Sequence, residues 1–150
     1  MTEHLTKIKA KIELIQNTKQ FQVFILWLLD DIEYGCLNIA NEPDTIKAMY
    51  GVIDLYREWI NTGKKPNEDR WIEAGEVAWE CTGTGCDIAY YCAQASSEYE
   101  NDRIYNSVFS CERIETDYGN NHLTITPSEI QIAQLSKLDE LIQLKFMTSK

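Results

Sequence analysis

The chain has 150 residues, 44% apolar and 25% charged, which are ordinary values for one globular domain. Its net charge is −10, and residues 66–118 hold twelve acidic against three basic side chains, a net of −9. This charge repels phosphate backbones, so we expect no nucleic-acid binding, and it attracts basic proteins. An alternative interpretation of equal weight is that the acidic residues only keep the protein in solution.

The cysteines and residues 1–20 indicate the cellular compartment of the protein. The five cysteines are an odd number, and residues 1–20 have lysine and glutamate among their apolar positions, unlike a signal peptide. We therefore expect reduced thiols in a cytoplasmic protein. The most apolar run, 23–29, is far shorter than the roughly 20 residues of a membrane span. We expect it to be a core helix and expect no membrane association.

Helical spacing of apolar residues recurs along the whole chain and predicts an all-α, single-domain bundle of six or seven helices over residues 1–150. The first two helices are expected over 3–18 and 21–40. The second is apolar nearly all round in its first half and belongs in the middle of the bundle. Pro43 can start a third helix, and Gly63 is placed to end it.

Turn and cap residues divide the remainder of the chain. Asn67 is expected to cap a fourth helix over 68–81, which the glycines of 82–85 then interrupt. A fifth helix is expected over 86–99 and a sixth over about 102–115.

The last quarter of the chain starts with a predicted turn at 117–121 and a short extended segment at 123–125. The run Thr126-Pro127-Ser128-Glu129 is a capping box with proline at the first helical position. It predicts a final helix to about residue 145.

The predicted fourth helix carries a pattern of like charges. Its acidic residues recur at intervals of four, three and four, which places them on one face: Asp69, Glu73, Glu76 and Glu80. Like charges four residues apart destabilise a helix by roughly 0.2–0.5 kcal/mol per pair. A solvated helix face accounts for this stripe, and so does a docking surface for a basic partner, which Ile72 and Trp79 would border. The expected partner-binding residues are these: Asp69, Glu73, Glu76, Trp79, Glu80 and the nearby Asp87.

Small residues on the opposite face of the same helix predict a close helix contact. Glycine inside a helix costs roughly 1 kcal/mol relative to alanine. Gly75, between Ala74 and Ala78, is therefore expected to pack closely against another helix. The fifth helix offers matching small residues, namely Ala89, Cys92, Ala93 and Ser96.

No set of residues completes a catalytic, metal or cofactor site, so we expect none and expect no enzyme activity. Cys81 and Cys86 have the spacing of a zinc-ligand pair, but Cys92 does not fit the pattern and no nearby histidine completes a zinc site. Glu-x-x-His pairs for a di-iron bundle do not occur, and no lysine follows the glycine-rich turn as in a phosphate loop. A Cys111–His122 pair can be written down, but nothing else in the sequence supports it.

Residues 24–115 combine a particular order of helices with several short motifs: Leu26-Trp27-Leu28-Leu29-Asp30, Asn41-Glu42-Pro43-Asp44, Arg57-Glu58-Trp59-Ile60-Asn61-Thr62-Gly63, Glu68-Asp69-Arg70, and Ala74, Ala78, Ala89, Ala93 and Ala95. In these features the segment resembles the alanine-rich immunity proteins of bacterial polymorphic toxin systems, the Imm-five-like domain. The resemblance implies a helical protein that binds and silences a cognate protein toxin. It implies no catalytic residues.

Two classes of function follow from these observations. The first is an immunity protein that neutralises a basic toxin through the acidic, aromatic-flanked surface. The alternative is a structural or regulatory helical module that acts by self-association through its aromatic helices. The sequence leaves the oligomeric state open, and a monomer in solution would favour the first class.

Overall fold

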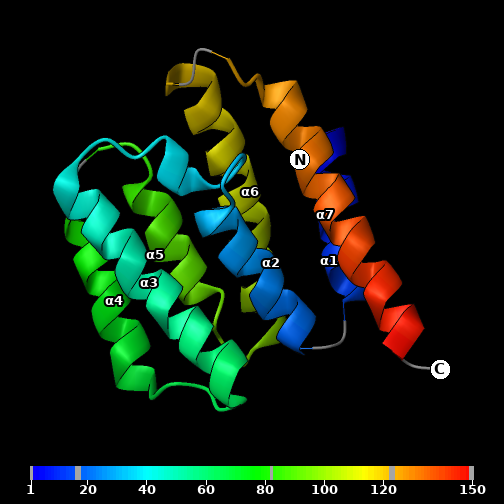
Figure 1. The fold of residues 1–150 in the computed structure, drawn as a ribbon, viewed down its shortest axis with the longest axis horizontal. Helices are drawn as coiled ribbons and strands as arrows, with labels where there is room; N and C mark the ends of the chain where they lie inside the picture. Colours follow the sequence, from blue (N-terminus) through cyan, green and yellow to red (C-terminus); the bar gives the residue numbers. More distant parts are fainter. Residues whose placement is uncertain (1, 16–17, 82, 122–123, 149–150) are drawn as a thin grey trace.

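The computed structural model describes residues 2–15, 18–81, 83–121 and 124–148, with side chains described up to residue 143. This part of the chain contains seven α-helices and one 3₁₀ turn, and no strand (Figure 1). The elements, in order, are α1 (Glu3–Leu14), α2 (Thr18–Asp30), η1 (Cys36–Asn38), α3 (Pro43–Thr62), α4 (Glu68–Glu80), α5 (Cys86–Gln94), α6 (Glu100–Asn121) and α7 (Pro127–Thr148). The predicted all-α bundle is confirmed.

The helices form two layers around one core. In one layer α4, α5, α6 and α1 pack side by side in that order, and α3, α2 and α7 pack over them. Figure 1 looks onto the second layer, with α1 largely hidden behind α7 and α4 behind α3. The layers meet at both edges, where α3 packs on α4 and α1 packs on α7. The outer side of the α4–α5–α6–α1 layer is therefore a continuous surface of the molecule.

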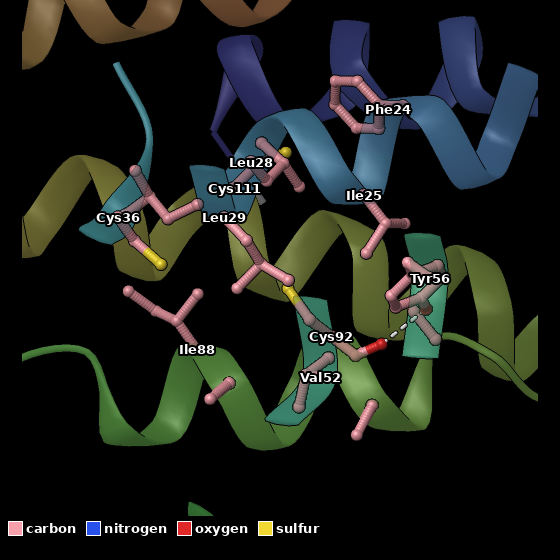
Figure 2. Packing of buried hydrophobic residues seen from close by; sticks show 14 of the residues in the cluster. Phe24, Ile25, Leu28, Leu29, Cys36, Val52, Tyr56, Ile88, Cys92 and Cys111 are labelled. Atoms are coloured by element: carbon pink, nitrogen blue, oxygen red, sulfur yellow. Dashed lines mark hydrogen bonds between the residues drawn. The ribbon is translucent and has the colours of Figure 1, made fainter. Parts of the chain in front are cut away.

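Helix α2 lies at the centre, as its apolar sequence predicts. Phe24, Ile25, Leu28 and Leu29 are at most 1% exposed. Figure 2 shows Ile25 and Leu29 on the side of α2 that faces α3 and α5, while Phe24 lies on the other side of the helix. Removing one such side chain from water contributes roughly 1.5–3 kcal/mol. This burial holds the layers together, and α3, which packs on α2, in turn packs on both α4 and α5.

One buried hydrogen bond links the two layers. The hydroxyl of Tyr56 on α3 donates to the backbone carbonyl of Cys92 on α5, at 2.6 Å (Figure 2). Cys92 is in the last turn of α5, where carbonyls lack helical partners. Burial raises the pKa of Tyr56 well above its ordinary value, which keeps the hydroxyl protonated as a donor.

Three predicted helix ends are confirmed by their caps. Gly63 ends α3 in the left-handed conformation, with φ of 70°. The side-chain oxygen of Asn67 accepts the N–H of Asp69 at 3.1 Å and starts α4. The hydroxyl oxygen of Thr126 accepts the N–H of Glu129 at 3.2 Å and starts α7. Local hydrogen bonds and backbone conformation fix these helix ends, so the sequence pattern could predict them.

The first two helices are shorter than predicted. Helix α1 ends at Leu14 and not at residue 18, because Ile15 is extended. Helix α2 ends at Asp30, and the expected continuation to residue 40 is wrong. The carboxylate of Asp31 accepts the N–H groups of Glu33 (3.1 Å) and Tyr34 (2.9 Å), which turns the chain. Aspartate commonly makes such turns, and this one outweighed the apolar pattern.

The fifth and sixth helices also differ from the prediction. Helix α5 ends at Gln94, and α6 runs on to Asn121, through the predicted turn at 117–121. Tyr118 is fully buried, and its hydroxyl donates to the Gly35 carbonyl at 2.7 Å. This tertiary contact outweighs the turn preference of the segment. Leu123, in the predicted extended segment, lies outside the described residues.

Candidate partner-binding surface

The acidic stripe of α4 faces solvent. Trp71, Gly75 and Ala78 form the buried side of this helix, and the Trp71 indole N–H donates to the Pro66 carbonyl at 3.2 Å. This anchor fixes the rotation of α4 about its own axis. The predicted acidic residues consequently all lie on the exposed side: Asp69, Glu73, Glu76 and Glu80.

The four carboxylates of the stripe have no ion-pair partner within the described part of the chain. The basic residue on the same helix, Arg70, pairs with Glu58 of α3 at 2.7 Å. The hydrogen bond from Arg70 lowers the pKa of Glu58. Arg70 is therefore paired with α3 and not with the stripe.

The predicted contact between the small faces of α4 and α5 is present, but it is looser than expected. A Cβ atom added to Gly75 would lie 3.7 Å from Gln94, 3.8 Å from Tyr90 and 3.9 Å from Ala93. These are ordinary van der Waals distances. The helices therefore pack at Gly75, yet they leave room for a methyl group. The expected packing of another helix at Gly75 is thus present, although it does not require glycine there.

Trp79 lies beside the stripe, on the side of α4 that faces α5. It is 66% exposed, and its ring centroid is 4.9 Å from that of Tyr90. A shallow hollow of about 250 Å³ lies between these two rings and the carboxylates of Glu76 and Glu80. Tryptophan and tyrosine are among the side chains that are enriched at the energetic centres of protein interfaces.

Asp87 differs from the other predicted site residues. Its carboxylate accepts the Nε–H of Arg113 at 2.7 Å, and Arg113 also lies 3.6 Å from Asp117. Burial and then the charge of Asp87 raise the pKa of Asp117. Asp87 thus belongs to a half-buried cluster that joins α5 to α6, and its charge is already matched within the fold.

Sequence reasoning missed a row of aromatic rings that crosses α5 and α6. Beyond Tyr90 come Tyr91, Phe109 and Tyr105, each ring in contact with the next. The four-residue spacing of Tyr105 and Phe109 indicates that they share one face of a helix. Their contact with the tyrosines of α5 depends on how the helices pack, which the spacing does not specify.

The five thiols are free, and they fall into two groups. Cys36, Cys92 and Cys111 are buried in the core, whereas Cys81 and Cys86 are half-buried at the α4–α5 turn. Burial raises the pKa of Cys92 to about 12 and that of Cys36 and Cys111 well above the ordinary value. No three candidate metal ligands cluster in the described part of the chain. His122, the other member of the Cys111–His122 pair, lies outside it.

Comparisons with known proteins return no match among family models, curated proteins or solved structures. The resemblance to the immunity proteins consequently remains an expectation drawn from the residues. None of the described helices has both the length and the apolar composition that crossing a bilayer requires.

Proposed function

We propose that this protein is an immunity protein that binds a basic bacterial toxin through the exposed side of α4. The observation that carries the proposal is the row of four unpaired carboxylates beside Trp79. Such a row raises the energy of the free protein through like-charge repulsion, and a basic partner relieves that repulsion. The resemblance of residues 24–115 to immunity proteins supports the same conclusion.

The proposed mechanism is occlusion of a basic cleft. From Asp69 to Glu80 the helix rises about 16 Å, which places four charges at a mean spacing of about 5 Å. One strand of a nucleic-acid duplex carries a phosphate about every 3.4 Å along the axis. The stripe therefore presents negative charge at a density within a factor of two of that strand. A toxin such as a nuclease would bind it where the substrate backbone otherwise lies.

Co-expression with the toxin tests this proposal. We expect the neighbouring gene to encode that toxin, and cells that make both proteins to survive. The triple variant Glu73→Lys, Glu76→Lys and Glu80→Lys should lose protection, because it replaces three attractive charges with repulsive ones.

A matched variant controls for the change in net charge. Glu3→Lys, Glu33→Lys and Glu129→Lys reverse three exposed acidic residues away from α4, and these should preserve protection. Survival with the α4 variant equal to that with this control would exclude the stripe as the binding site. Self-association of the purified chain in sedimentation, with no effect on toxicity, would favour the alternative structural module.

A further inference from the structure

A second hollow lies on the same layer, between α1 and α6. This groove has a volume of about 520 Å³. Leu5 and Val108, which are 5% and 8% exposed, form its floor, together with the half-buried Ile104. Tyr105 and Phe109 line it as well, and Tyr105 is 61% exposed. The groove therefore combines an apolar floor with aromatic side chains that a partner can contact.

The charged residues that line the groove are mostly acidic. They are Lys9, Glu13, Glu100 and Glu112, with a net charge of −2. None of them forms an ion pair with another residue in the described ranges. A segment that enters this groove thus contacts apolar surface below and three unpaired glutamates and one unpaired lysine at the edges.

The aromatic row connects the groove with the α4 stripe. Ring centroids are 5.8 Å apart for Tyr105 and Phe109, and 4.5 Å apart for Phe109 and Tyr91. They are 5.4 Å apart for Tyr91 and Tyr90, and 4.9 Å apart for Tyr90 and Trp79. All four separations are typical of aromatic rings in contact. Apolar surface therefore runs from the groove across α6 and α5 to α4.

We propose that the groove between α1 and α6 binds an amphipathic helix of the partner, with a leucine-like face on the groove floor and lysine or arginine against the glutamates. Helices that bind in grooves present apolar residues at positions i, i+3 or i+4, and i+7. The groove supplies a matching apolar strip, with Glu100 and Glu112 on its α6 edge and Glu13 beside Lys9 on its α1 edge. The inference rests on the proposed function only for the statement that the toxin supplies this helix.

The charge of the groove decides between two occupants. A second copy of this chain, with its net charge of −10, would on average bring further negative charge to a groove that is already negative. Like charges placed opposite each other oppose association. A basic amphipathic helix avoids this repulsion and matches the net charge of −2 that three glutamates and Lys9 give the groove. We therefore assign the groove to a basic helix.

Binding of a designed peptide tests the proposal without any toxin. The probe is a 14-residue peptide with leucines on one helical face and lysines on the other, titrated into the full-length, ¹⁵N-labelled protein. The largest amide shifts should fall on α1 and α6 around Leu5, Ile104 and Tyr105. A peptide of the same composition with its leucines spread around the helix should bind at least about tenfold more weakly.

Two exposed tyrosines provide matched variants. Tyr105→Ala should weaken binding of the amphipathic peptide by about tenfold, because it removes an aromatic contact from the groove. Tyr99→Ala should leave binding unchanged within about twofold, since Tyr99 is 75% exposed and does not line the groove. Both side chains are solvent-exposed, so both variants should fold, and the amide spectrum checks this directly.

Three outcomes would overturn the inference. They are equal binding of the two peptides, amide shifts confined to α4, and a Tyr105-dependent dimer of the chain in sedimentation. The triple α4 variant separates the two proposals, because it should lose toxin neutralisation while it keeps groove shifts with the peptide. Failure of either assay leaves the other proposal standing.

Discussion

Trp79 on α4 packs its ring against Tyr90 on α5, with centroids 4.9 Å apart, while 66% of Trp79 remains exposed to solvent. The contact holds a large, rigid side chain at the surface next to Glu76 and Glu80. The contact with Tyr90 therefore already holds the Trp79 indole in place in the free protein. A side chain that is already held in place loses less entropy on binding than a mobile one.

Trp79→Ala should separate binding from stability. Loss of the ring contact should reduce the free energy of unfolding by about 0.5–1.5 kcal/mol. Loss of a tryptophan at the centre of an interface should weaken toxin binding by about 2 kcal/mol or more. Urea unfolding and a binding titration measure the two effects. Ile132→Ala on α7, which removes a side chain that is 65% exposed, is the control and should change neither quantity appreciably. Equal binding by both variants would place Trp79 outside the interface.

Substitution of two glycines by alanine should change the free energy of unfolding in opposite directions. Gly75→Ala should raise the free energy of unfolding by up to about 1 kcal/mol, because alanine favours the helix and its methyl group fits against α5. Gly85→Ala should lower it by at least about 1 kcal/mol, because Gly85 has φ of +93° and an added Cβ would collide with Met49. Chemical denaturation of the two variants provides the comparison. A destabilised Gly75→Ala variant would show that α4 and α5 lie closer together than described.

The thiols should react in two groups. Cys81 and Cys86 are half-buried and should be alkylated by iodoacetamide in the native protein at mildly alkaline pH. Cys36, Cys92 and Cys111 should react only when the core opens, because burial blocks access and raises the pKa of each thiol. Mass mapping after timed alkylation, with a urea-unfolded sample as control, measures the order. Early modification of Cys92 would contradict the described core.

Asp117 should make stability depend on pH. Burial and the charge of Asp87 raise the pKa of Asp117 above its ordinary value of 3.8. A raised folded-state pKa gives stability that is present below the unfolded pKa and is lost as pH rises through the folded value. The free energy of unfolding of the wild type, relative to Asp117→Asn, should therefore fall as the pH increases from about 3 to about 7. Urea titrations across this range test the sign, and a pH-independent difference would contradict it.

Features set by neighbouring residues could be predicted from the sequence. The caps at Asn67 and Thr126 and the end of α3 at Gly63 depend on local hydrogen bonds and backbone conformation. The exposed side of α4 followed from the spacing of its acidic residues, because helix geometry converts spacing into a face. These predictions needed no knowledge of distant contacts.

Features set by distant residues could not be predicted in this way. Helix α6 continues through a turn-like segment because Tyr118 is buried against Gly35, more than eighty residues away in sequence. Asp87 belonged to the predicted surface by its position, yet Arg113 neutralises it across α5 and α6. The aromatic row likewise depends on the order in which α4, α5 and α6 pack. Each case requires the three-dimensional arrangement.

The dissociation constant of the toxin complex is the most direct test of the claim that α4 binds the toxin. It should be measured for the wild type and for the variant Glu73→Lys, Glu76→Lys, Glu80→Lys, with circular dichroism showing that both are folded. Reversal of three charges that face a basic cleft should weaken binding by about 100-fold or more at low salt, with a smaller difference at high salt. Equal dissociation constants for the two folded proteins would contradict the claim.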